Sequence, residues 1–183
     1  MSTQRRLILY MSMSVDGFAA GPDGEMDWLG ASQPHGDHRQ RGVAELLGQT
    51  GLLVLGRCAA QDMAQAWPGS TSPTGELMNA LEKVVFSSTI DSVEWDNARV
   101  SDRPIEDEIP TLKDQLGKDI VVFGGVAFAR ALAHHGLIDE YRINVQPATL
   151  GNGLPLLPGG LALELVNSTA WADGPVTHTY VPR

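Results

Sequence analysis

The stretch of sequence that decides the fold is Ile120-Val121-Val122-Phe123-Gly124-Gly125-Val126-Ala127-Phe128. Its apolar first half predicts a buried strand, the glycine pair predicts a tight turn, and residues 126–135 predict a helix that Gly136 closes. Paired glycines let the backbone approach a ligand closely, and the unbonded N–H groups at the start of a helix attract an anion. On its own, the segment fits either a phosphate site or a simple strand-to-helix turn.

Two more predicted strands end in polar residues that suit a phosphate group. The apolar run at 52–55 is followed by Gly56 and Arg57, and the run at 83–86 is followed by Ser87 and Ser88. A guanidinium is a rigid, always-charged donor, and serine hydroxyls either bond a phosphate or cap a turn. Arg57 alone fits a surface salt bridge equally well. Because ligands collect at the carboxyl ends of strands in open α/β sheets, the three junctions together predict one shared nucleotide cleft.

The rest of the chain repeats this alternation of short strands and helices. Further strands are predicted at residues 5–13, 140–145, 162–169 and 176–181, and further helices at 38–47, 57–66, 75–81 and 105–116, the last with Pro110 as an alternative first residue. Residues 21–37 predict a loop, and residues 90–103 give no clear signal. Short, wholly apolar strands beside helices indicate a sheet covered on both faces. We therefore predict a three-layer α/β fold with a mixed, mostly parallel central sheet whose last strands pair antiparallel.

Length and composition limit the functions of this fold. The 183 residues suffice for one well-cored domain, which we expect to span residues 1–183. The formal net charge of −9 repels nucleic-acid phosphates, and the basic residues are scattered along the chain. The longest uncharged stretch, 143–163, holds three prolines and four glycines and cannot form a membrane helix. A single cysteine, Cys58, excludes an internal disulfide and fits a reducing cytoplasm. From charge, hydropathy and cysteine content together, we expect a soluble cytoplasmic protein that binds neither nucleic acid nor membrane.

The carboxylates and histidines near the N-terminus have ordinary structural explanations. Asp16 precedes a glycine and suits a turn, and Asp37 stands where the N-cap of a helix falls. The histidines lack the spacing of metal ligands, so we expect no metal site. Trp28, within the predicted loop, fits either an aromatic ligand site or the core.

Several segments match a known family in order and spacing across nearly the whole chain. They are 12–18 (Ser-Met-Ser-Val-Asp-Gly-Phe), 27–29 (Asp-Trp-Leu), 55–57 (Leu-Gly-Arg), 85–88 (Val-Phe-Ser-Ser), 122–125 (Val-Phe-Gly-Gly) and 148–155 (Ala-Thr-Leu-Gly-Asn-Gly-Leu-Pro). With this set the chain resembles the dihydrofolate-reductase-like reductases, and among them the single-domain relatives of the reductase half of the bacterial riboflavin deaminase–reductase. No single segment is specific to these reductases, whereas the ordered set of segments is.

The resemblance implies a dihydrofolate-reductase-like reductase that uses NADPH and forms a homodimer. The residues that it implies for the cofactor are Ser12, Trp28, Gly56, Arg57, Ser87, Ser88, Gly124, Gly125, Val126, Ala127 and Phe128. In this set the glycine pair and the helix start cradle the pyrophosphate, the serines lie by the adenosine, and Arg57 lies near the 2′-phosphate. Ser12 and Trp28 flank the nicotinamide. The hydride chemistry belongs to the cofactor, and the protein places the nicotinamide against the substrate.

Two positions depart from the family pattern. Members usually carry a threonine two residues after the arginine, and here Ala59 has no hydroxyl for the cofactor, which leaves the choice between NADPH and NADH open. Riboflavin-pathway members carry a glutamate before the glycine pair, and here Phe123 cannot make that hydrogen bond, which disfavours their pyrimidine substrate. Asp16 and Phe123 are the candidate substrate-binding residues, and Asp37 is the candidate catalytic acid that orients or protonates the substrate.

Residues and resemblance together predict a function. We expect an NADPH-dependent reductase that transfers a hydride to a small heteroaromatic or imine-like substrate and acts on CH–OH or CH–NH groups. The alternative is a cofactor-binding or dimerisation module of the same fold without turnover. Ala59, Phe123 and the unassigned proton donor favour this alternative.

Overall fold

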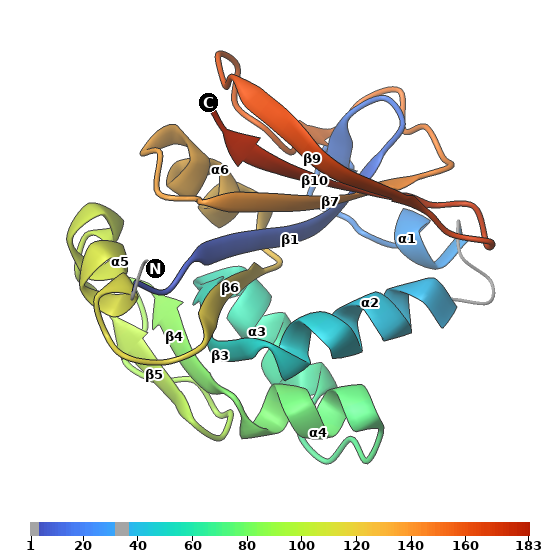
Figure 1. Ribbon diagram of the computed structural model, residues 1–183. Coiled ribbons are helices and arrows are strands. Elements are labelled where there is room, and N and C mark those ends of the chain that lie inside the picture. Colours follow the sequence, from blue (N-terminus) through green and yellow to red (C-terminus); the bar gives the residue numbers. More distant parts are fainter. Residues whose placement is uncertain (1–3, 32–36) are drawn as a thin grey trace.

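The computed structural model describes residues 4–31 and 37–183, with side chains except at residues 31 and 37–40. In this part of the chain, eight strands form one sheet in the order β5-β4-β3-β6-β1-β7-β10-β9, and β2 pairs with β8 in a small second sheet (Figure 1). The strands are β1 (Leu7–Ser14), β2 (Phe18–Ala20), β3 (Thr50–Gly56), β4 (Glu82–Phe86), β5 (Ala98–Ser101), β6 (Asp119–Phe123), β7 (Glu140–Gln146), β8 (Leu154–Pro155), β9 (Leu163–Ala170) and β10 (Val176–Pro182). The helices are α1 (Trp28–Ala31), α2 (Asp37–Gly48), α3 (Arg57–Ala66), α4 (Pro73–Ala80), α5 (Ile105–Lys113) and α6 (Val126–His134).

The large sheet is mixed and mostly parallel, as predicted. From β5 to β7 every neighbouring pair of strands runs parallel. β10 pairs antiparallel with both β7 and β9, which confirms the prediction that the last strands pair antiparallel. The parallel part brings the carboxyl ends of β1, β3, β4 and β6 to one edge of the sheet, where ligands collect in such folds.

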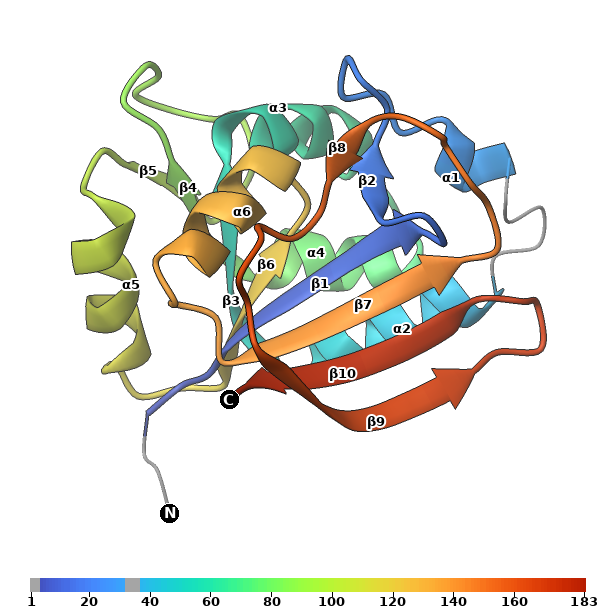
Figure 2. The ribbon, with the colours of Figure 1, turned by 90° about the horizontal axis from the view of Figure 1, so that it is seen from above.

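Helices cover both faces of the parallel part of the sheet (Figures 1 and 2). Leu7 and Leu9 of β1 pack in one core with residues of α5 and α6, whereas Ile8 packs in a second core with residues of α2, α3 and α4. This alternation follows from the two-residue period of a strand. Each of these side chains is almost fully buried and contributes about 1.5–3 kcal/mol to folding. The predicted three-layer arrangement is confirmed.

The start of α5 differs from one of the two predicted alternatives. The alternative start at Pro110 is wrong, because α5 begins at Ile105 and carries Pro110 within it. The first turn contains the acidic residues Glu106, Asp107 and Glu108, whose negative charges interact favourably with the positive end of the helix dipole. The N–H groups of Asp107 and Glu108 donate to the carbonyl of Pro104 at 3.1 and 3.0 Å. These interactions of the first turn stabilise a start at Ile105. Pro110 lies within the helix, on its solvent-exposed side.

Several short elements escaped prediction. α1 lies in the stretch predicted as loop, and β5 lies in the stretch without a clear signal. β2 and β8 are three and two residues long and pair with each other from distant parts of the chain. Elements this short are set by tertiary contacts rather than by a local pattern. No helix in the described ranges has both the length and the apolar character needed to cross a membrane.

Lys83 is a buried charge at the start of β4. Its ammonium donates to the carbonyls of Asn79, Leu81 and Asp96 at 3.2, 2.6 and 3.0 Å. It also lies 4.5 Å from the centroid of the Trp95 ring. Burial lowers the pKa of Lys83 to about 8. Lys83 is therefore a structural anchor for the turn before β4, away from the functional edge of the sheet.

Candidate functional site

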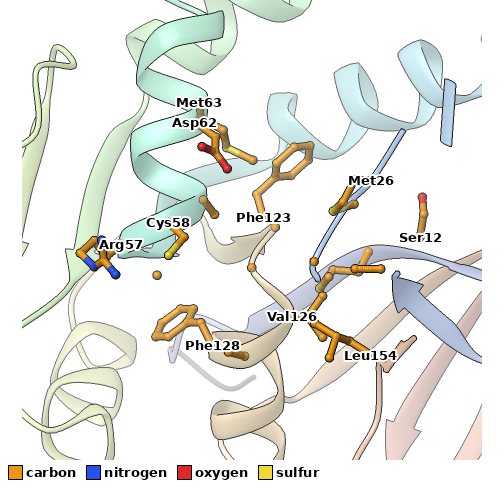
Figure 3. A pocket seen from close by; sticks show the side chains of 18 of the residues that line it. Ser12, Met26, Arg57, Cys58, Asp62, Met63, Phe123, Val126, Phe128 and Leu154 are labelled. Atoms are coloured by element: carbon orange, nitrogen blue, oxygen red, sulfur yellow. The ribbon is translucent and has the colours of Figure 1, made fainter. Parts of the chain in front are cut away.

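A cavity of about 800 Å³ opens at the carboxyl edge of the parallel strands (Figure 3). Strands β1, β3, β4 and β6 each contribute residues at or near their ends, among them Ser12, Gly56, Phe86 and Phe123. The first two turns of α3, the first turn of α6, loop residues between β2 and α1, Leu29 of α1 and Leu154 of β8 also line the cavity. The three strand ends that were expected to share a cleft therefore meet at this cavity, since Gly56, Phe86 and Gly124 all line it.

Two helices begin at the cavity without a side-chain cap. α3 follows Gly56 and α6 follows Gly125, and neither N-cap residue makes a side-chain hydrogen bond to its helix. The unbonded N–H groups and the helix dipole give each start a partial positive charge. Two such starts on one cavity form a surface suited to an extended anion.

The glycine pair is required by the close approach of α3 to the turn between β6 and α6. Gly124 and Gly125 have φ angles of +80° and +81°, which L side chains rarely adopt. A Cβ atom at Gly124 would lie 3.0 Å from Cε of Met63, and one at Gly125 would lie 3.4 Å from Cβ of Ala59. Side chains here would strain the turn and fill the space between the two helix starts.

Gly56 plays a related part at the end of β3. A Cβ atom there would lie 2.9 Å from Cβ of Phe128 on α6, so glycine allows the two elements to touch. The Phe128 ring stacks on Phe86, with centroids 5.3 Å apart. This contact fixes α6 against the ends of β3 and β4, and with it the position of the glycine turn.

Arg57 is the first residue of α3 and lines the cavity beside Cys58. Its Nη1 donates to Oε1 of Gln61 at 3.2 Å, one turn along the helix, and the side chain is exposed. Among the residues that the structure describes, no other lysine or arginine lines the cavity. The positive charge of Arg57 therefore adds to the partial positive charge at the start of α3. We call this end of the cavity, formed by Arg57, Gly124, Gly125 and the first turn of α6, the cofactor end.

The other end of the cavity, which we call the substrate end, is mainly apolar. Tyr10 and Phe123 stack there with centroids 5.8 Å apart and planes 8° from parallel, and Met26 lies across from Phe123 (Figure 3). Stacked aromatic rings and a methionine form a flat, polarizable wall that suits a planar ring. Among the polar groups of this end are the carboxylates of Asp23 and Asp62 and the hydroxyl of Ser12, whose Oγ accepts a hydrogen bond from Nε2 of Gln146 at 3.5 Å.

Asp16 lies outside the cavity lining. Its carboxylate accepts hydrogen bonds from Oγ of Ser14 at 2.6 Å and from the backbone N–H groups of Leu150 and Gly151 at 3.1 and 2.7 Å. These donors, the Ser14 hydroxyl foremost, hold the pKa of Asp16 below its ordinary value. Asp16 thus ties the turn after β1 to the loop before β8, and its assignment to the substrate stays a prediction.

Three other predicted residues are not brought to the cavity lining, and a fourth, Asp37, has a side chain outside the described part of the chain. Oγ of Ser87 accepts a hydrogen bond from the backbone of Thr89 at 3.1 Å, and Ser88 is exposed. Trp28 begins α1, and its Nε1 is buried without a hydrogen-bond partner among the described residues. Asp37 is the first residue of α2, but its side chain lies outside the described part of the chain. The roles assigned to all four stay predictions.

Beyond the glycine turn and Arg57, most of the cavity wall comes from residues that the sequence did not indicate. They include Tyr10, Met11, Asp23, Met26, Leu29, Asp62, Met63 and Leu154. The helical period does connect Asp62 and Met63 to Cys58 and Ala59, one turn earlier on the same face of α3. The residues between β2 and α1 belong to an irregular segment, where no spacing rule applies.

Comparison with known proteins identifies the family of this fold. The model of the RibD C-terminal domain family matches residues 5–178, almost the whole chain. The chain belongs to this family. One relative, the uncharacterized protein YyaP of Bacillus subtilis (strain 168), is 31% identical over 97% of this chain and 95% of its own length.

Solved structures extend the RibD C-terminal domain assignment to the fold. A putative riboflavin biosynthesis protein from Shewanella sp. PV-4 is 25% identical, with a TM-score of 0.78 over 97% of this chain and 99% of that protein. Dihydrofolate reductase from Enterococcus faecalis, in a complex with NADP(H), is 18% identical, with a TM-score of 0.67 over 100% of this chain and 99% of that one. The suspected family and the reductase-type fold are confirmed.

Proposed function

We propose that this protein is an NADPH-dependent reductase that transfers a hydride to a small heteroaromatic or imine-like substrate. The observation that carries the proposal is one cavity with two unlike ends. The cofactor end combines two uncapped helix starts with Arg57, and the substrate end has the stacked rings of Tyr10 and Phe123. A reductase that uses a nicotinamide dinucleotide needs both surfaces, because the phosphates of the cofactor are anionic and the reactant beside its nicotinamide is flat.

The residues at the cofactor end fit such a cofactor. The Gly124–Gly125 turn leaves a space that Cβ atoms would fill, and the N–H groups at the start of α6 would hold the pyrophosphate there. Arg57 would hold the 2′-phosphate, because a guanidinium presents several donors to phosphate oxygens. NADPH, when bound, supplies the hydride. The solved dihydrofolate reductase of similar fold was obtained with NADP(H), which supports this choice.

The substrate end favours a flat, largely apolar reactant. We propose a reduction whose product carries a CH–NH or CH–OH group. Tyr10 and Phe123 would hold the reactant by stacking, and the apolar wall would keep water from the reacting atoms. Phe123 has no group that hydrogen-bonds a pyrimidine, which favours a substrate other than that of the riboflavin pathway.

The test is a titration followed by an assay for turnover. Quenching of tryptophan fluorescence is recorded with NADPH and, separately, with NADH. Oxidation of NADPH is then followed by absorbance with a panel of pterins, pyrimidines, cyclic imines and quinones. We expect micromolar affinity for NADPH and oxidation with at least one compound of the panel. An absence of binding at high micromolar NADPH would sink the proposal.

A second candidate function is a cofactor-binding or dimerisation module of the same fold without turnover. Ala59 favours it, because this residue stands beside the Gly125 turn and has no hydroxyl to bond the cofactor. NADPH that binds but is not oxidised with any compound of the panel would support this function over the first.

We also propose that the protein forms a homodimer, as its resemblance to the dihydrofolate-reductase-like reductases implies. Light scattering coupled to size-exclusion chromatography measures the mass directly. Twice the chain mass of 19.6 kDa is expected, and a single chain mass at all accessible concentrations would contradict this proposal.

A further inference from the structure

A second cavity, of about 530 Å³, lies between α2 and the antiparallel end of the large sheet. Residues of β7, β9 and β10 form its floor, and Gly42 and Glu45 of α2 form one wall. In Figure 2, β9 and β10 extend the sheet beyond α2. Of the residues that the structure describes, Tyr10 alone lines both this cavity and the first. The second cavity is therefore a separate site, and it has the size of a small-molecule pocket.

Two rows of polar side chains cross the floor of this cavity, and the first contains an amide of fixed orientation. Thr177 of β10 stands opposite Asn144 of β7 and, on its other side, opposite Thr169 of β9. Nε1 of Trp171 donates to Oγ1 of Thr177 at 2.8 Å, and an indole N–H can only donate. The single hydroxyl hydrogen of Thr177 therefore goes to Oδ1 of Asn144, at 2.6 Å. This chain fixes the amide of Asn144, which is 4% exposed, and leaves its two Nδ2 donors to the cavity that it lines.

The second row has charges that are already paired. Thr179 of β10 stands between Arg142 of β7 and Asn167 of β9, two residues along each strand and so on the same face of the sheet. Nε of Arg142 donates to Oε1 of the buried Glu140 at 2.6 Å, and Nη1 of Arg6 donates to Oε2 of the same carboxylate at 2.7 Å. Both oxygens of Glu140 are thus occupied. The floor is a mainly neutral, polar surface rather than a charged one.

The mixture of donors and acceptors in this cavity indicates the class of its ligand. Asn144 provides donors, the carboxylate of Glu45 provides acceptors, and the hydroxyl of Thr179 is both. An anionic group would be repelled by Glu45, and an ammonium group would face the N–H donors of Asn144. A hydroxyl group both donates and accepts, so a ligand with several hydroxyls pairs with every one of these groups. Tyr10 and Trp171 supply apolar ring surface for the C–H groups of such a ligand.

We infer that the second cavity is a binding site for a neutral polyhydroxyl ligand, a sugar or a cyclic polyol. Nδ2 of Asn144 and the hydroxyl of Thr179 donate to oxygens of the ligand, and the carboxylate of Glu45 accepts from one of its hydroxyls. The site lies apart from the cofactor end and the substrate end of the first cavity. The inference therefore goes beyond the proposed function and does not depend on NADPH binding.

The test is a titration followed in two-dimensional amide NMR spectra. D-Glucose, D-galactose and D-mannose are each compared with their 2-amino sugar, which is a cation at slightly acidic pH, and with their uronate, which is an anion. At least one neutral hexose is expected to bind with a Kd of about 1 mM or lower and to shift the amides of residues 142–144, 167–169 and 177–179. Both charged forms of that hexose are expected to bind at least about fivefold more weakly.

Two substitutions on the floor test the assigned contacts. Asn144→Asp keeps the shape of the side chain and replaces two donors with an acceptor, so the affinity for the hexose should fall about tenfold. Thr179→Val removes the hydroxyl from a side chain of similar shape, so this affinity should fall about fivefold. Thr111→Val removes an exposed hydroxyl from α5, outside both cavities, and should leave the affinity unchanged. The same spectra show directly whether each variant is folded.

Several results would overturn the inference. None of the neutral hexoses shifts these amides, or a charged form binds as tightly as the neutral one, or both floor variants keep the full affinity. If the amides shift on dilution of the protein alone and no hexose moves them, a second copy of the chain covers this face in place of a sugar. NADPH is titrated into the same samples: hexose binding without NADPH binding contradicts the proposed function alone, and NADPH binding without hexose binding contradicts this inference alone.

Discussion

The two ends of the cavity differ in the chemical groups that form them. The cofactor end consists mainly of backbone: the Gly124–Gly125 turn and the N–H groups that begin α3 and α6, with Arg57 as the added charge. The substrate end consists of side chains, namely the Tyr10–Phe123 stack, Met26 and Asp62. The first is suited to an anion of fixed geometry, and the second to the shape and charge of a particular ring.

This difference predicts that the binding of a dinucleotide and the binding of a planar reactant can be altered separately. Backbone N–H groups recognise phosphate whatever the side chains are, so we expect the cofactor end to tolerate side-chain changes provided that the glycines remain. Side chains at the substrate end can change without disturbing the turn. Substitutions at each end therefore test whether the division is real.

The largest effect is expected from Gly125→Val. A β-branched residue at a φ of +81° is strained, and its side chain would press on Ala59. We expect the free energy of unfolding to fall by about 1–3 kcal/mol and NADPH affinity to fall by about 30-fold or more. Chemical denaturation and fluorescence titration measure the two quantities.

A matched substitution separates strain from binding in this prediction. Gly136 follows α6 with a φ of +65° and has no atom within 4 Å of its Cβ position. Gly136→Val should destabilise the fold through the same backbone strain and leave NADPH affinity of the folded protein unchanged. Equal losses of affinity in both variants would show that the Gly125 turn is structural only.

Arg57→Ala is expected to have the next largest effect. It removes the one cation of the described cavity wall, so NADPH affinity should fall about tenfold. NADH lacks the 2′-phosphate, and its affinity should change by less than about twofold. Arg183→Ala, at the exposed C-terminus, serves as the control for a lost charge. If NADPH and NADH lose affinity equally, Arg57 does not read the 2′-phosphate.

Phe123→Leu and Phe86→Leu compare the two ends with the same chemical change. Each removes one ring of a stacked pair, and each should lower the free energy of unfolding by about 1 kcal/mol. Phe86→Leu loosens α6 and should weaken NADPH binding severalfold, whereas Phe123→Leu should leave NADPH affinity unchanged and weaken the binding of a planar heterocycle such as quinoline. The same ranking of both ligands in both variants would erase the distinction between the ends.

The smallest effect on ligand binding is expected at Lys83, which belongs to neither end. Its pKa is about 8 in the folded protein and about 10.4 in an unfolded chain. Between these values the unfolded chain holds more protons, so the stability of the wild-type protein relative to Lys83→Met should rise with pH from 8 to about 10.4. Urea denaturation of both proteins at several pH values measures this difference. A stability difference that falls as the pH rises over this range would contradict the prediction. NADPH affinity should be equal in the two proteins at pH 7.

The cofactor end could largely be predicted from the sequence, because it consists of local motifs. Strand, glycine and helix follow one another directly at Gly56 and at Gly124, and the sheet's parallel order brings them together. Ser87 and Ser88 show the limit of the same reasoning: they follow a strand to the correct edge, yet Ser87 bonds within its own turn. A local motif gives the position of a residue along the edge, whereas its hydrogen-bond partner depends on the fold of the next few residues.

The substrate end could not be predicted in the same way, because its parts come from separate elements. Tyr10 and Phe123 are more than a hundred residues apart and meet only because β1 and β6 are neighbours in register. Asp16 looked like a turn residue or a substrate ligand, and its three donors come mainly from a loop more than 130 residues away. Contacts of this kind are tertiary, and no spacing within a single segment encodes them.

The measurement that tests the central claim most directly is NADPH binding followed residue by residue in two-dimensional amide NMR spectra. The claim is that the cofactor is held by the backbone of two helix starts. On addition of NADPH, the amides of residues 57–59 and 124–128 should shift most, with smaller changes around Tyr10. Spectra in which these amides stay in place at millimolar NADPH, or in which the largest shifts fall on β9 and β10, would contradict the account.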